Sequence, residues 1–413
     1  MNAPVTLGAP AFLARYEALK GGLPGDSALR ASAAAAFRAA GLPGATRDRR
    51  IEAWKYTSLR PLAEISFAGP AIEHRDVPLD IGIPSLVFVD GVFDAALSAS
   101  VPGFACFADQ PDFGTLTWPD REPLVALNTM LAEDGASLQI PDNVDAGVIR
   151  LVSIASDGGS SHPRHMIRLG AGARLTLLEV FGGNGTYLHN PVTEVHVAAG
   201  AALTHVRLQN ESTDAFHLAT LYAEIADGGE YDGFTLSLGG RTTRFEIHAL
   251  LSGPGATAHL NGAQLLSGTQ HGDFTSVVRH AAPGCASRQT VKNVLAGHSR
   301  GVFQGRIEVA RGAQKTDGYQ MNQALLLSPD AEIDSKPELE IFADDVKCSH
   351  GATVGELDAE QLFYLRSRGI PDAEARAILV RAFLAEALDV VKDDTVRGLL
   401  ERSVESWWGR QAA

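Results

Sequence analysis

Small-residue turns recur at a nearly fixed spacing through the middle of the chain. Their glycines are separated by 28, 29, 26, 29 and 28 residues, at Gly172, Gly200, Gly229, Gly255, Gly284 and Gly312. Such a period is typical of a solenoid, in which each unit covers the apolar face of its neighbour. Because the runs between the turns are strand-like and contain no helical pattern, we expect a β-helix over residues 136–355. A β-sandwich with evenly spaced turns is the alternative interpretation.

The part before this segment, residues 1–135, is predicted to be a helical domain up to about residue 65, followed by a transition segment. Runs rich in Ala, Leu, Arg and Glu predict helices over residues 11–20 and 27–40, each followed by glycines that end it. Asp90-Gly91 lies between two apolar runs and predicts a hairpin, because a type I′ turn needs positive φ at both central residues. A short helix is predicted over residues 123–133.

The part after the β segment, residues 356–413, is also predicted to be helical. Asp358 is suited to cap a first helix that ends before Gly369. A second helix runs from Pro371 to Val391, and a third covers residues 394–408. The second helix carries an apolar stripe that we expect to be core, at Ile378, Leu379, Ala382, Phe383, Ala387, Leu388 and Val391. We expect this part to be separable from the β core.

Composition and missing motifs exclude several classes of function. The formal charge of −14 argues against nucleic-acid binding, which needs a basic surface. No apolar run approaches the roughly 18 residues of a membrane span, and the N-terminus lacks a secretory pattern. Three widely spaced cysteines do not form a disulfide framework, so we expect a cytoplasmic protein. The chain has no phosphate-binding loop of the G-x-x-x-x-G-K-[ST] type, and we therefore expect no ATP site of its own.

Cys348-Ser349-His350 is the strongest candidate for metal chemistry. Thiol and imidazole are the side chains that soft and borderline metals prefer. In a strand, residues i and i+2 point to the same face, so Cys348 and His350 are expected to project together. No finger-like set of further ligands follows, which argues against a closed zinc site. The spacing suits two ligands of one cluster or ligands shared with a second chain, and a strand end packed under a helix is the structural alternative.

The surrounding stretch resembles the SufB/SufD family of iron–sulfur cluster assembly scaffolds. The resemblance is carried by ordered matches at Gln320–Ser328, Lys336–Ile341, Asp344–Gly355, Leu357-Asp358 and Leu362–Ile370. Within the family, the chain length and the motif Glu52-Ala-Trp54-Lys55-Tyr56-Thr57-Ser58-Leu59 are nearer the SufD branch.

This resemblance implies a fold and a role. It implies a right-handed parallel β-helix flanked by helical domains, in a non-catalytic scaffold subunit of a SufBCD complex. It implies a heterodimer with SufB through the end of the β-helix, and docking of the ATPase SufC on the C-terminal helices. His350 would be a ligand of a transient iron–sulfur cluster shared with SufB, and Cys348 a helper. A flavin on the complex is left open.

Alternatives remain at this point. A SufB-like subunit or a homodimeric scaffold is within the same class, and a β-helix enzyme acting on polysaccharide is a different one. The missing export signal and the flanking helices weigh against the enzyme. Cys285 sits at a repeat turn and is expected to be a small structural residue, and Cys106 has even less to suggest a functional role.

Overall fold

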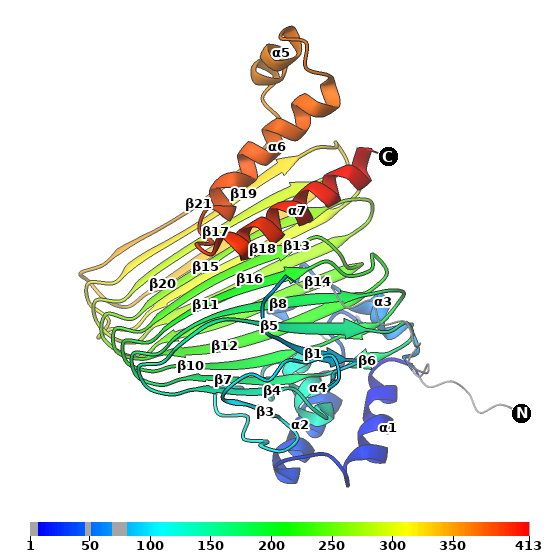
Figure 1. Cartoon of the computed structure of the whole chain (residues 1–413), viewed down its shortest axis with the longest axis vertical. Helices are drawn as coiled ribbons and strands as arrows, with labels where there is room; N and C mark the ends of the chain where they lie inside the picture. Colours follow the sequence, from blue (N-terminus) through cyan, green and yellow to red (C-terminus); the bar gives the residue numbers. More distant parts are fainter. Residues whose placement is uncertain (1–6, 46–50, 68–80, 413) are drawn as a thin grey trace, which may run out of the picture.

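The computed structural model describes residues 7–45, 51–67 and 81–412, and its architecture is a two-sheeted parallel β-solenoid with helices at both ends of the chain (Figure 1). Within the described residues, one sheet, sheet A, has the strand order β2 (Val92–Phe93), β1 (Ser85–Val89), β5 (Asp145–Ala155), β8 (Arg174–Gly183), β11 (Ala202–Gln209), β13 (Glu230–Ser237), β15 (Thr257–Leu266), β17 (Ala286–Leu295), β19 (Asp317–Leu326) and β21 (Lys347–Gly355).

The facing sheet, sheet B, is built from the strands that alternate with these along the chain. Its order is β20 (Glu332–Ile341), β18 (Arg300–Val309), β16 (His271–His280), β14 (Thr242–Leu251), β12 (Phe216–Ile225), β10 (Val192–Val197), β7 (Arg164–Leu169), β4 (Ala136–Ile140) and β3 (Phe104–Cys106), and the short strands β6 (Ser160–Ser161) and β9 (Leu188–His189) pair beside β12. Only β1–β2 and β3–β4 pair antiparallel among the described strands. Successive turns therefore stack in parallel, which confirms the β-helix and excludes the sandwich.

The repeated turns stack along one edge of the solenoid. The backbone N–H of Gly172, Gly200 and Gly255 each donates to a carbonyl in the turn of the next unit, at 2.9–3.1 Å. These three glycines have φ between 65° and 70°, in the left-handed region where a Cβ is costly. Each of these turns is thus hydrogen-bonded to the turn of the next unit.

Two of the six predicted turn glycines do not hold this conformation. In the third turn the left-handed residue is Gly228, one position before Gly229, and its N–H donates to Pro254 O at 2.9 Å. In the last turn it is Lys315 instead of Gly312. The period was read correctly, but the exact residue was wrong in these two places, because the neighbourhood offers more than one residue that can turn the chain.

A large apolar core fills the space between the two sheets, from Leu86 and Phe88 at one end to Val291 and Phe303 towards the other, and a smaller cluster around Ile307 and Val309 follows at the final turns. The N-terminal helices cover the outer face of sheet B, where they pack on Leu188, Phe216 and Leu218. These helices are α1 (Ala9–Leu19), α2 (Ser27–Ala40), α3 (Arg60–Ala63) and α4 (Pro123–Leu131), with a 3₁₀ turn at Glu52–Trp54. The predicted helices over 11–20, 27–40 and 123–133 are thereby confirmed, as is the hairpin at Asp90-Gly91.

The C-terminal helices divide into a packed part and a projecting part (Figure 1). They are α5 (Ala359–Ser367), α6 (Asp372–Leu388) and α7 (Asp394–Ala412). Asp358 caps α5 as predicted, accepting from the N–H groups of Glu360 and Gln361. The second half of α6 and all of α7 pack on the outer face of sheet A, whereas α5 and the start of α6 extend beyond the solenoid.

The packed part shares an apolar cluster with the β core, because Leu384, Leu400 and Trp407 are buried against the apolar outer face of sheet A. Whether the β core folds without the C-terminal part stays a prediction. The buried side of α6 agrees with the predicted stripe in its second half, where Ala387, Leu388 and the following Val391 are buried, and differs from it in the first half. Val380 and Leu384 are buried, whereas Ile378 and Leu379 face α5. No helix of the described residues is both long and apolar enough to cross a membrane.

Candidate functional site

The predicted pair Cys348 and His350 lies on β21, which is the last strand of sheet A. In the parallel register with β19, Cys348 is opposite Gly318 and His350 is opposite Gln320. Gly318 and Gln320 are buried, whereas the residues that alternate with them are partly exposed. In successive turns of the solenoid, inward-facing residues at equivalent positions form rows, and Cys348 and His350 are the last members of two such rows. The expectation that they share one face of the strand is therefore met.

Cys348 is half-buried and contacts the end of the core. Its neighbours there include Ile307, Leu339 and Val346. Burial raises the pKa of the Cys348 thiol, and the nearby Asp317 carboxylate raises it further, while the Gly318 backbone lowers it. The thiol is consequently protonated at neutral pH in the isolated chain, and it needs a metal or a nearby positive charge to become a thiolate ligand.

His350 is exposed on the same strand. Among the residues that the structure describes, its imidazole takes part in no hydrogen bond or ion pair. An imidazole held by a paired backbone but without a side-chain partner can accept a metal without breaking an existing interaction.

The end of the solenoid around these two residues is uncovered. In the described chain, β21 and β20 are the terminal strands of their sheets and pair with a neighbour on one side only. Ile341, Phe342 and Val354, which lie in or beside these strands, are 39%, 66% and 55% exposed. An open strand edge rimmed by large apolar side chains is a surface that another protein can extend or cover.

A second uncovered apolar surface lies on the projecting helices. Phe363 and Tyr364 of α5 are 73% and 56% exposed, and α5 has no buried residue. Together with Leu365, Ile378 and Leu379 they line a shallow hollow between α5 and α6. The helix pair is thus held on the solenoid by the far end of α6 and offers its apolar side to solvent.

The other two cysteines are structural in their surroundings. Cys285 is buried in the core between the sheets, and its thiol donates to Gly253 O at 3.3 Å. Cys106, on β3, is partly buried, and burial raises its pKa. All three cysteines are unpaired. Of the histidines in the early turns, His205 is buried and bonds Glu179 at 2.9 Å.

The N-terminal motif at Glu52–Leu59 has a structural role on sheet B. The ring of Trp54 lies 4.2 Å from the guanidinium carbon of Arg244, and Thr57 bonds His271 at 2.9 Å and Asp273. The motif therefore fixes the first part of the chain to strands β14 and β16.

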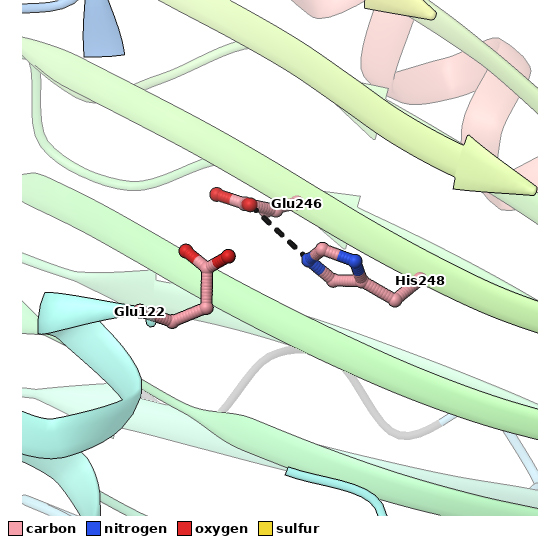
Figure 2. Close-up of side chains that lie close together, drawn as sticks. All are labelled: Glu122, Glu246 and His248. Carbon is pink, nitrogen blue, oxygen red and sulfur yellow. Dashed lines mark hydrogen bonds and ion pairs between the residues drawn. The ribbon is translucent and has the colours of Figure 1, made fainter. Parts of the chain in front are cut away.

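Sequence reasoning missed a cluster that this region helps to build. Glu122, Glu246 and His248 bring one ligand atom each to within 4.8 Å of one another (Figure 2). The Glu246-Ile-His248 spacing on β14 carries the same i, i+2 signal as Cys348 and His350, but Glu122 comes from far earlier in the chain. A second cluster, Glu230, Asp232 and His259, lies on the outer face of sheet A.

Comparison with known proteins agrees with this geometry. Residues 152–383 match the family model described as "SUF system FeS cluster assembly, SufBD core domain". The iron–sulfur cluster assembly protein SufD of Escherichia coli K12 is 33% identical over 372 residues, covering 86% of this chain and 87% of that protein. An iron–sulfur cluster assembly SufBD family protein of Synechocystis is 30% identical over 403 residues, covering 89% of each.

A plant relative matches a shorter stretch, since the chloroplastic protein ABCI7 of Arabidopsis thaliana is 36% identical over 242 residues, which cover 57% of this chain and 51% of that protein. The matched core corresponds to the stacked turns and reaches through β21 into α6. With this core, the open final turn and these relatives in agreement, the chain belongs to the SufBD family of the SUF iron–sulfur cluster assembly system.

Proposed function

We propose that this protein is a non-catalytic scaffold subunit for iron–sulfur cluster assembly, which joins a SufB-type partner through the open end of its solenoid. The observation that carries the proposal is the uncovered final turn, where Cys348 and His350 end two inward-facing rows beside exposed Ile341 and Phe342. Its relatives are named as iron–sulfur cluster assembly proteins, which supports the same role here. The three unpaired cysteines suit a reducing compartment such as the cytosol.

His350 is proposed as the cluster ligand at this junction. Its imidazole is exposed and free to bind iron, and one strand-end histidine leaves the remaining coordination positions to the partner. Cys348 is proposed as a helper, because its protonated thiol must first lose a proton before it can bind. The cluster itself is cargo that leaves the complex after assembly.

The projecting helices are proposed to dock the ATPase partner SufC. The apolar hollow between α5 and α6 is of the kind that receives a helix or loop of another protein. α5 and the start of α6 project beyond the final turns of the solenoid (Figure 1).

A pair of matched substitutions tests the junction. Phe342→Glu puts a charge on the open end, and Val92→Glu puts the same charge on the exposed edge strand β2 at the opposite end of sheet A. In co-expression with SufB and SufC, we expect Phe342→Glu to lose SufB and Val92→Glu to retain it. Equal SufB yield with both variants contradicts the proposed junction.

The same two variants, purified without SufB and SufC, separate a heterodimer from a homodimer. If this chain pairs with itself through the open end, its mass in solution will be that of a dimer, and Phe342→Glu will convert it to a monomer. If the end is reserved for SufB, the chain alone will be a monomer with either substitution.

A further inference from the structure

A group of metal-binding side chains lies on the outer face of sheet B, apart from the solenoid end. Glu246 and His248 are two residues apart on β14 and therefore project from the same face of the sheet. Glu122, the residue that precedes α4, points its carboxylate towards both of them (Figure 2). β14 thus supplies Glu246 and His248, and the residue before α4 supplies Glu122.

The ligand atoms are already close to the spacing that one ion needs. His248 Nε2 lies 3.1 Å from Glu246 Oε1, and all three ligand atoms are within 4.8 Å of one another. Ligands bound to one ion at about 2.1 Å are separated by about 3 Å at octahedral angles, so a small movement of Glu122 completes the set. An ion between Nε2 and Oε1 would replace the proton that these atoms share now.

The surroundings keep the two ligands on β14 in place. Glu246 Oε2 accepts from Arg244 at 2.9 Å, which leaves Oε1 on the side of His248. Arg244 is held in turn by Asp273 and by the ring of Trp54. The ring of His248 stacks on Tyr222 with centroids 4.6 Å apart. Fixing of ligands by such neighbours is a common property of metal sites.

Carboxylates and arginines both surround the three groups. Glu246 and Asp273 share the guanidinium of Arg244. Arg121, Arg279 and Arg306 line the same cavity as Glu122, and Arg306 is already paired with Glu308 and Glu340. Glu122 therefore adds a further carboxylate to a group whose nearest guanidinium charges are already shared.

An independent sign of a ligand is the hydroxyl of Tyr222. Tyr222 is 2% exposed, and its hydroxyl is buried without a hydrogen-bond partner. Tyr222 lines the same cavity of about 490 Å³ as Glu122 and His248, and its ring stacks on that of His248. A buried hydroxyl without a partner, on a residue that lines a cavity, calls for a water molecule or ligand beside it.

We propose that Glu122, Glu246 and His248 bind one divalent first-row transition-metal ion. One imidazole and two carboxylates form a borderline donor set that suits Fe²⁺, Mn²⁺, Co²⁺ and Zn²⁺ better than Ca²⁺ or Cu⁺. The site does not depend on the proposed cluster ligands, since it is built from β14 and the start of α4 and not from β21.

The experiment is a Co²⁺ titration of the full chain, stripped of metal and carrying Cys348→Ala and His350→Ala so that the solenoid end cannot contribute. We expect one equivalent of Co²⁺ to bind, with visible absorption bands and no thiolate band, and Zn²⁺ to displace it. In this background, Glu122→Gln and His248→Gln should each weaken binding about tenfold or more.

Two control variants decide where the ion sits. Glu224→Gln removes a carboxylate from the same cavity but not from the cluster, and Asp232→Asn disables the second cluster. Both should bind Co²⁺ like the parent. Unfolding of each metal-free variant is followed by circular dichroism, and Co²⁺ should raise the unfolding temperature of the parent and controls only. Unchanged binding in Glu122→Gln and His248→Gln, or loss with Asp232→Asn, overturns the proposal.

Discussion

At the scale of single residues, the turn glycines carry the fold through their backbone conformation. Gly200 has φ of 65° and its hypothetical Cβ would meet no atom within 4 Å, so a substitution there is penalised by conformation and not by a clash. Gly312 is equally open but has no positive φ. The two positions therefore separate conformational strain from loss of space.

We predict that Gly200→Val lowers the free energy of unfolding by about 1–3 kcal/mol, because valine must enter the left-handed region. Gly312→Val should cost much less. Urea unfolding followed by circular dichroism measures both. Equal destabilisation by the two substitutions would show that the turn conformation is not what these glycines provide.

Buried histidines make the stability of the protein depend on pH. Burial lowers the pKa of His280 to about 4, and its Nε2 lies 2.9 Å from the Ser287 hydroxyl. The unfolded chain, with a pKa near 6.5, binds a proton that the folded protein excludes. The neutral His280 side chain therefore costs no stability above about pH 6.5, and the free energy of unfolding falls as the pH drops from there towards 4.

We predict that lowering the pH from 7.5 to 5 costs about 2 kcal/mol at His280 alone. His280→Gln keeps a neutral hydrogen-bonding group and should make the urea midpoint less dependent on pH. His298→Gln, at an exposed position, is the control and should leave the pH dependence unchanged. If the urea midpoint of both variants changes with pH as that of the parent does, His280 is not the group that stays unprotonated in the folded protein.

The sequence predicted the chemistry of neighbouring residues better than that of distant ones. The shared face of Cys348 and His350 follows from the two-residue period of a strand, and the Asp358 cap from local hydrogen bonding. The meeting of Glu122 with Glu246 and His248 depends on where α4 lies on sheet B. Such a contact between distant segments leaves no local pattern.

At the scale of elements, each C-terminal helix has a different environment. α7 is a covering helix for sheet A, whereas α5 has no buried side chain and α6 changes from one role to the other along its length. An apolar stripe on a helix predicts that one side is covered, but it does not say by what. For this reason the sequence located the helices correctly and predicted the burial of Ala387 and Leu388, whereas Ile378 and Leu379 line the hollow beside α5 instead of the core.

We predict that Phe363→Asp abolishes co-purification with SufC without lowering the unfolding temperature, because Phe363 is exposed and contributes little to the folded chain. Ala385→Asp adds the same charge to an exposed position of α6 outside the hollow and should retain SufC. Retained SufC with Phe363→Asp, or loss with both variants, would contradict docking in the hollow.

At the scale of the whole molecule, the solenoid is covered unequally. Helices cover the outer faces of both sheets, but within the described chain nothing covers the final turn at β20 and β21. The fixed glycine period predicted the stacking of parallel turns, because each unit repeats the same local turn. It could not predict which end stays open, since that depends on where the flanking helices pack.

The open turn leads to the central claim, that His350 binds a cluster at the junction with SufB. The direct measurement is cluster formation by the complex containing His350→Ala, scored as iron and acid-labile sulfide per complex, beside the yield of that complex. Because His350 is exposed and unpartnered in the described structure, we predict normal complex yield with severely reduced iron and sulfide. Full iron and sulfide in the His350→Ala complex, or a loss explained by failure of the complex to assemble, would contradict the account.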